Sequence, residues 1–104
     1  MRVIAVATLR VFWAEYPDSE QPLKAWFDEA RHAVWASPAD IKRHYRSASI
    51  LRDNRVVFNI SGNKYRLIVA VLYPAQMVLI KFIGTHEQYD KIDAQTVSQR
   101  RRLK

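Results

Sequence analysis

The sequence predicts an α+β fold in which N-terminal helices pack on one face of a mainly antiparallel sheet and a short C-terminal helix follows the last strand. Apolar side chains recur at helical spacing early in the chain, and strand-like runs separated by turn residues follow from residue 55. One face of those strands is continuously apolar and needs a cover. With 104 residues, 49% of them hydrophobic, we expect a single domain, 1–104, around one core.

The N-terminal part is expected to form a short strand and three helices. The strand occupies residues 1–6, and the first helix occupies 8–16, where a proline stops it. Asp18 and Gln21 have the spacing of a capping box at the start of a second helix. A third, short helix is expected to begin at Pro38, because proline is favoured at the first helical position. The buried stripe of the second helix is made of Leu23, Trp26, Phe27, Ala30 and Val34.

Three strands are expected at 55–61, 64–73 and 78–83, because these runs are rich in β-branched and aromatic residues. The Gly62-Asn63 pair between the first two suits a two-residue hairpin turn, and residues 74–77 suit a four-residue turn. Each turn fixes a register. The expected cross-strand pairs are Phe58 with Leu67, Asn59 with Arg66, Val71 with Ile80, and Ala70 with Lys81.

This register separates an apolar face from a half-polar one. The helices are expected to cover the apolar face, and the charged side chains on the other face stay open to solvent. The apolar face comprises Val56, Phe58, Ile60, Tyr65, Leu67, Val69, Val71, Tyr73, Val78, Ile80 and Phe82. The polar residues of the other face are Asn59, Ser61, Lys64, Arg66 and Lys81.

After the last strand, Thr85 and Gln88 have the spacing of a capping box, which places His86 at the first residue of a short helix. Tyr89 follows three residues later and therefore shares a face with His86. Residues 95–104, which end in a run of basic side chains, are expected to form a flexible tail.

The distribution of charge predicts a polyanionic partner. Residues 1–40 carry a net charge of −2 and residues 41–104 a net charge of +9, for a total of +7. A charge concentrated in this way is typical of nucleic-acid-binding surfaces. The alternatives are that the basic residues serve solubility or meet an acidic protein. The chain has no cysteine and no apolar run long enough to span a bilayer, so we expect a soluble cytoplasmic protein with no membrane partner.

The residue types near the C-terminal helix suit metal-independent cleavage of RNA. That reaction needs a base for the 2′-hydroxyl, cations for the crowded phosphorane and an acid for the leaving oxygen. His86 suits either proton role, Arg66 and Lys81 supply charge, and Tyr89 could orient, donate a proton or stack on a base. Taken singly, each residue could equally be structural. The sequence shows no zinc spacing and no phosphate-binding loop, so no metal or cofactor is expected.

RNA contacts are expected from the basic segment 42–66, because its seven Lys and Arg side chains meet only one acidic residue, Asp53. Its candidate RNA-binding residues are Lys42, Arg43, Arg46, Arg52, Arg55 and Asn59.

Two signatures carry a resemblance to a known family: GNKYR at 62–66 and THxxYDKID at 85–93, with VFNI at 57–60. Together they resemble the HigB toxins, a branch of the RelE-like mRNA interferases. The resemblance implies helices on one face of a twisted, mainly antiparallel sheet. It also implies a toxin that cleaves mRNA, typically on the ribosome, until a HigA-like antitoxin with a helix-turn-helix domain neutralises it. The family's basic and proton-transferring positions map onto Lys64, Arg66, Lys81, His86 and Tyr89.

The sequence is also compatible with a function of another class. The chain could be a non-catalytic regulator that binds RNA or the ribosome, or a toxin homologue that has lost activity. A DNA-binding repressor is a third possibility, but no basic recognition helix preceded by a glycine-containing turn is visible. Growth arrest on expression, relieved by His86→Ala, would favour the nuclease.

Overall fold

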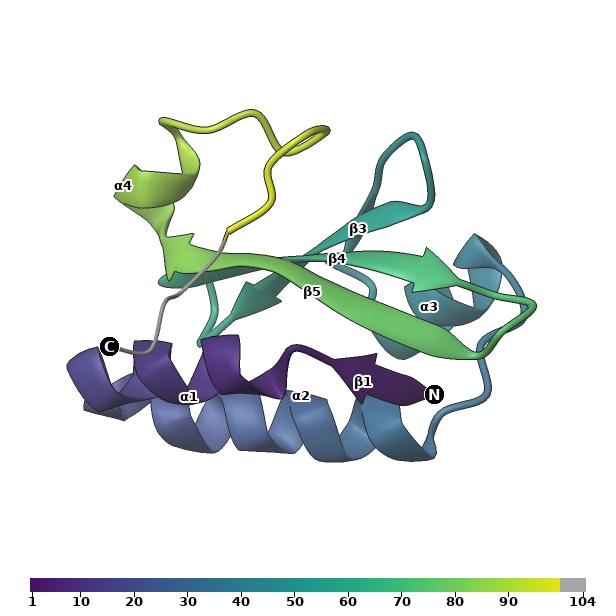
Figure 1. Cartoon of the computed structure of the whole chain (residues 1–104), viewed down its shortest axis with the longest axis horizontal. Helices are drawn as coiled ribbons and strands as arrows, with labels where there is room; N and C mark the ends of the chain where they lie inside the picture. Colours follow the sequence, from purple (N-terminus) through teal and green to yellow (C-terminus); the bar gives the residue numbers. More distant parts are fainter. Residues whose placement is uncertain (100–104) are drawn as a thin grey trace.

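A computed structural model describes residues 1–99 and shows a five-stranded mixed sheet with the strand order β1-β5-β4-β3-β2 (Figure 1). The edge strand β1 runs parallel to β5, and the other neighbours are antiparallel. The short edge strand β2 was not expected from the sequence. The strands are β1 (Arg2–Ile4), β2 (Ser49–Ile50), β3 (Arg55–Ile60), β4 (Tyr65–Leu72) and β5 (Met77–Thr85).

The N-terminal helices lie on one side of the sheet and the C-terminal helix α4 lies at one end, far from α3 (Figure 1). This arrangement confirms the predicted α+β fold. None of the helices within residues 1–99 has the length and apolar character needed to cross a bilayer. The helices are α1 (Val6–Glu15), the 3₁₀ turn η1 (Pro17–Ser19), α2 (Glu20–His32), α3 (Pro38–His44) and α4 (His86–Tyr89).

The main core lies between the N-terminal helices and the sheet. The ring of Trp26 on α2 meets Phe58 on β3 edge to face, with 5.4 Å between the ring centroids. Leu67 at the centre of β4 is fully buried. The predicted apolar face of the sheet is confirmed from Val56 through Ile80, all of it in this core or packed against it. Val34 does not belong to the buried stripe, since α2 ends at His32 and Val34 is 80% exposed.

The first hairpin has the predicted register, and the second does not. Phe58 pairs with Leu67 and Asn59 with Arg66. In the second hairpin, the strands close at Leu72 and Met77, so the turn comprises residues 73–76. Gln76 adopts a left-handed conformation there with φ 55° and donates its side-chain amide to the carbonyls of Tyr73 and Trp35, at 2.9 and 2.8 Å. These contacts end the turn one residue earlier than expected. Val71 therefore pairs with Val78 and Ala70 with Leu79, not with Ile80 and Lys81.

A bulge in β5 changes which side chains face the helices. Ile80 pairs with Val69 and Phe82 pairs with Ile68, so Lys81 has no partner on β4. An extra residue in one strand reverses the in–out alternation beyond it. Ile83 consequently lies in the main core, and Phe82 lies on the opposite face. The prediction that Phe82 faces the helices was wrong for this reason.

A second, smaller apolar cluster covers part of the face opposite the helices, which we call the outer face. Val57, Ile68 and Phe82 form its floor. The chain after β5 forms its cover, with partly buried side chains from Tyr89, Ile92, Ala94 and Val97. The sequence analysis left this face open, because it did not foresee that the C-terminal segment folds back over it.

Residues 95–99, the described part of the predicted flexible tail, contact the sheet. The Arg55 guanidinium donates to the carbonyls of Ala94 and Val97, at 3.1 and 2.7 Å. Gln99 donates its backbone N–H to the Lys81 carbonyl at 2.7 Å and accepts from the Ile83 N–H at 3.0 Å. The rest of the predicted tail, 100–104, lies outside the described residues.

Candidate active site

The start of α4 is built as the sequence predicted. The Thr85 hydroxyl accepts from the Gln88 N–H at 3.1 Å, and the Gln88 side chain accepts from the Thr85 N–H at 2.9 Å, which completes the capping box. His86 is the first helical residue, and its N–H donates to the Lys64 carbonyl at 3.2 Å. Its imidazole is 53% exposed, with Nδ1 3.3 Å from Asp90 Oδ2. This carboxylate can orient the ring while Nε2 stays accessible.

Arg66 lies beside α4 on the outer face. The Arg66 guanidinium carbon is 5.7 Å from the centre of the Tyr89 ring, within cation–π range. Arg66 also donates to the backbone and side-chain oxygens of Asn63, at 3.1 and 3.4 Å. Asn59 on β3 and Gly84 on β5 are its cross-strand neighbours. The structure thus brings Arg66, Asn59 and Tyr89 together, with His86 one helical turn from Tyr89.

Gly84 keeps this end of the outer face compact. A Cβ atom at Gly84 would lie 2.5 Å from the Phe82 ring and 2.9 Å from the Gln88 side-chain oxygen. Any larger residue would push the ring or the capping side chain of α4 out of place. The absence of a side chain at this position therefore lets the helix with His86 begin close against the sheet.

Lys64 interacts with a residue of η1 and is not part of the group around Arg66. Its ammonium group pairs with Asp18 on η1, and the Tyr65 hydroxyl donates to the same carboxylate. The hydrogen bond from Lys64, followed by that from Tyr65, lowers the pKa of Asp18. Burial, followed by the Asp18 contact, raises the pKa of Tyr65 to about 12. Asp18 does not cap α2: the N-cap residue is Ser19, with no side-chain cap, so the predicted Asp18–Gln21 capping box was wrong.

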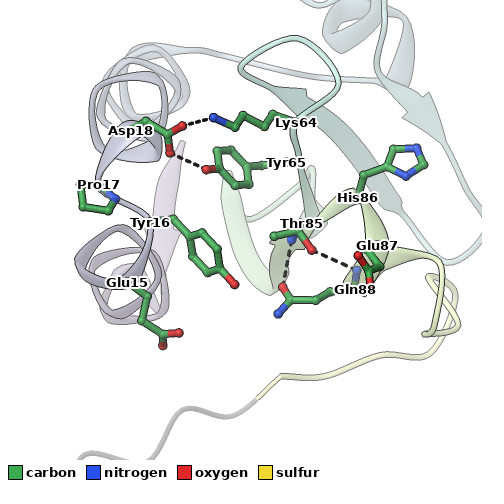
Figure 2. A pocket seen from close by; sticks show the side chains of 10 residues that line it. All are labelled: Glu15, Tyr16, Pro17, Asp18, Lys64, Tyr65, Thr85, His86, Glu87 and Gln88. Atoms are coloured by element: carbon green, nitrogen blue, oxygen red, sulfur yellow. Dashed lines mark hydrogen bonds and ion pairs between the residues drawn. The ribbon is translucent and has the colours of Figure 1, made fainter.

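A groove of about 890 Å³ opens between η1 and α4 (Figure 2). The rings of Tyr16 and Tyr65 face it from one side, and Thr85 and Gln88 face it from the other, whereas the His86 ring points away from both tyrosines. The sequence analysis missed this groove, because its two walls are distant along the chain. The lining residues are Glu15, Tyr16, Pro17, Asp18, Lys64, Tyr65, Thr85, His86, Glu87 and Gln88.

Lys81 is not brought to His86. It occupies the bulge of β5, and its carbonyl accepts from Gln99. Lys81 precedes His86 by five positions along an extended strand, which corresponds to roughly 16 Å at the usual rise per residue. Lys81 and Lys64 therefore flank the group formed by Arg66, His86 and Tyr89 without joining it.

Of the predicted RNA-binding residues, two lie on α3, two in the segment between α3 and β3, and two on β3: Lys42 and Arg43, Arg46 and Arg52, and Arg55 and Asn59. Lys42 closes the turn after α3 by donating to the carbonyls of Arg46 and Ala48, at 2.7 and 2.8 Å. Arg43 pairs with Asp40, and the Arg55 guanidinium donates hydrogen bonds to carbonyl groups of the C-terminal segment. Within residues 1–99, the exposed side chains of Arg46 and Arg52 make no hydrogen bond or ion pair.

Metal-ligating side chains are dispersed over the described part of the chain. Residues 1–99 contain no group of three or more His, Asp and Glu side chains close enough together to hold a metal ion. At α4, two potential metal-ligating side chains lie within contact distance of each other, those of His86 and Asp90.

Comparisons with known proteins match most of the chain, including the region of Arg66, His86 and Tyr89. A family model described as HigB toxin, the RelE-like toxic component of a toxin-antitoxin system, matches residues 19–92. The chain is also 26% identical over 92 residues to the mRNA interferase toxin HigB of Escherichia coli (strain K12), a match that covers 86% of this chain and 88% of that protein. The mRNA interferase HigB proteins of Escherichia coli O157:H7 and Shigella flexneri are similar to the same extent.

Proposed function

The chain belongs to the HigB toxin family, the RelE-like toxic components of toxin-antitoxin systems, and we propose that it is an endoribonuclease that cleaves mRNA. In this proposal the protein works in the cytoplasm, on mRNA held by the ribosome, and a HigA-like helix-turn-helix antitoxin is its neutralising partner. The observation that carries the proposal is the group of Arg66, His86 and Tyr89 on the exposed end of the sheet.

The residues of this group can supply the proton transfer and the charge stabilisation that RNA cleavage needs. The 2′-hydroxyl of RNA is an internal nucleophile, so the protein needs to move protons and stabilise charge, and we propose that it does so without a metal ion. His86 serves as the base or the acid, with Asp90 orienting its ring. Arg66 binds the phosphate, for which a planar guanidinium with several donors is well suited. Tyr89 orients the Arg66 guanidinium or donates a proton.

The remaining basic residues act more weakly, through the field they create. Lys64 and Lys81 lie on either side of the group. Lys81 adds positive charge around the phosphate, whereas the charge of Lys64 is balanced by Asp18. Arg46 and Arg52, toward the other end of the sheet, contact the RNA backbone or ribosomal RNA in this proposal. Contacts of this kind release counterions, so we expect affinity for RNA to fall steeply as salt concentration rises.

The test pairs cleavage of a translated mRNA with thermal melts of each variant. We expect His86→Ala and Arg66→Ala to slow cleavage by about 10² to 10⁴-fold, because each removes a proton-transfer or charge-stabilising group, and to melt close to the wild type. Arg10→Ala, an exposed arginine on α1 with no part in the proposed RNA surface, is the matched control for the loss of one cation. Variants that fold normally and still cut at the wild-type rate would show that the site is elsewhere.

Two further measurements complete this test. Cleavage in EDTA should match cleavage in its absence, and loss of activity that Mg²⁺ restores would overturn the metal-independent mechanism. A wild-type protein that binds RNA or ribosomes but cuts no message would instead be a non-catalytic regulator.

A further inference from the structure

The groove between η1 and α4 has no role in the proposed chemistry, although it adjoins the site. His86 is one of its lining residues, while its imidazole points away from Tyr16 and Tyr65 (Figure 2). The chain at Thr85 and His86 thus forms the boundary between the groove and the proposed cleavage site. A molecule bound on the outer face next to His86 can reach into the groove across this boundary.

The lining of the groove suits a flat heterocycle, and the groove is large enough to admit one. Its volume of about 890 Å³ lies within the range of small-molecule pockets, roughly 300 to 1,000 Å³. Phe12 stacks on the Tyr16 ring, with 4.6 Å between their centroids, and holds it in place. The Tyr65 ring meets Tyr16 edge to face, with 5.9 Å between their centroids, and the hydroxyl edge of Tyr16 remains for a ligand. A rigid aromatic wall of this kind is typical of sites that bind single-stranded nucleic acid by stacking.

Two polar groups at the groove have hydrogen-bonding capacity that the described residues do not use. The Tyr16 hydroxyl makes no hydrogen bond within residues 1–99, and Figure 2 shows it on the side that faces Gln88. The Gln88 side chain accepts from Thr85 through its oxygen, which leaves its NH₂ group available. Together these groups offer donors and an acceptor to the edge of a bound ring.

Within the described part of the chain, the groove offers no unpaired Lys or Arg side chain to a phosphate. Lys64 is the only Lys or Arg in its lining, and its ammonium group pairs with Asp18. A phosphate would therefore gain little here, although the chain as a whole carries a net charge of +7. The Glu87 carboxylate lies 3.9 Å from the Lys91 ammonium and keeps acceptor capacity for a ligand. A neutral base with an exocyclic amino group would be attracted, because carboxylates accept hydrogen bonds from such groups.

We propose that this groove binds one nucleobase of the RNA, from a nucleotide next to the scissile phosphate, and favours adenine, cytosine or guanine over uracil. The inference rests on the proposed function for its substrate. The sugar–phosphate backbone stays outside, near Arg66, and the base turns inward against Tyr16. Tyr16 and Glu87 would then set base preference, while His86 and Arg66 set the rate.

The primary experiment digests an RNA with a randomised stretch and sequences the cut ends. We expect the wild type to disfavour uracil by about tenfold at one position beside the cut, a value within the range for one well-made base contact. Tyr16→Ala and Glu87→Gln should reduce this preference to twofold or less. Tyr16→Phe, which keeps the ring, separates stacking from the hydroxyl contact. Tyr73→Phe, outside the groove, is the control and should keep the wild-type profile.

A second measurement does not depend on cleavage. The His86→Ala protein is titrated with short oligonucleotides that contain either cytosine or uracil, and NMR shifts of the Tyr16 ring are followed. Selective shifts with cytosine support the proposal, whether or not the wild type cuts RNA.

Three outcomes would overturn the inference. One is a wild-type cut profile without base preference, and another is an unchanged preference in a folded Tyr16→Ala variant. The third is a groove that responds to the antitoxin but to no oligonucleotide, which would make it a protein interface. Failure of the wild type to cut any RNA is a different result and would count against the proposed function instead.

Discussion

The two faces of the sheet are closed in different ways. The face toward α1 and α2 is covered by amphipathic helices, and its central side chains, such as Leu67, are fully buried. The outer face is covered only in part, by a segment without regular structure beyond α4. That segment is held by a few hydrogen bonds, chiefly those that Arg55 donates and those that Gln99 makes with Lys81 and Ile83.

This difference places the buried core and the proposed site on alternate residues of a single strand. Neighbouring residues of β4 face opposite ways, so Leu67 packs in the main core while Arg66 lies beside Tyr89. Functional groups can lie on the outer face because it need not exclude water completely. The helix face supplies most of the buried apolar area that keeps the sheet folded.

The largest expected effect is on the helix face. Leu67→Ala should lower the free energy of unfolding by about 2 to 5 kcal/mol, because it removes buried methyl groups and leaves a cavity. Arg66→Ala, one residue away, should change it by only about 0.5 kcal/mol, as for a surface substitution. Urea unfolding of both variants measures the contrast. Equal losses of unfolding free energy in the two variants would mean that the two faces contribute equally to stability.

An intermediate effect is expected where the C-terminal segment is fastened. Arg55→Ala removes two charge-assisted hydrogen bonds to the carbonyls of Ala94 and Val97 and should cost about 1 to 3 kcal/mol. Amide hydrogen exchange should accelerate in residues 94–99 more than in β4. Arg52→Ala, an exposed arginine near the same end of β3, is the control. Uniform acceleration in both regions would show that the segment unfolds only with the whole domain.

The smallest effect concerns the ion pair between η1 and the turn before β4. Lys64 and Tyr65 lower the pKa of Asp18 in the folded state, so this contribution to stability is present above the unfolded-state pKa near 3.8 and is lost as pH falls through the folded-state value. Asp18→Asn should therefore melt below the wild type at pH 7, and the difference should shrink on acidification below pH 4. A difference that persists at pH 2 would assign the role of Asp18 to something other than its charge.

Short-range signals determined much of what the sequence could predict. The Gly62-Asn63 turn set the register that pairs Asn59 with Arg66, and the Thr85–Gln88 capping box placed His86 at the start of α4. Each depends on residues within a few positions of one another, whose hydrogen bonds and backbone preferences are visible in the sequence.

Only the tertiary structure decided the rest, because the contacts involved join residues far apart in the chain. Asp18 could cap a helix locally, but Lys64, 46 residues away, takes its carboxylate instead. The bulge at Lys81 moved Phe82 to the outer face, where the C-terminal segment covers it. The same long-range packing brings Tyr16 opposite Gln88 and forms the groove. Periodicity and spacing describe one element at a time, whereas these features depend on which elements meet in space.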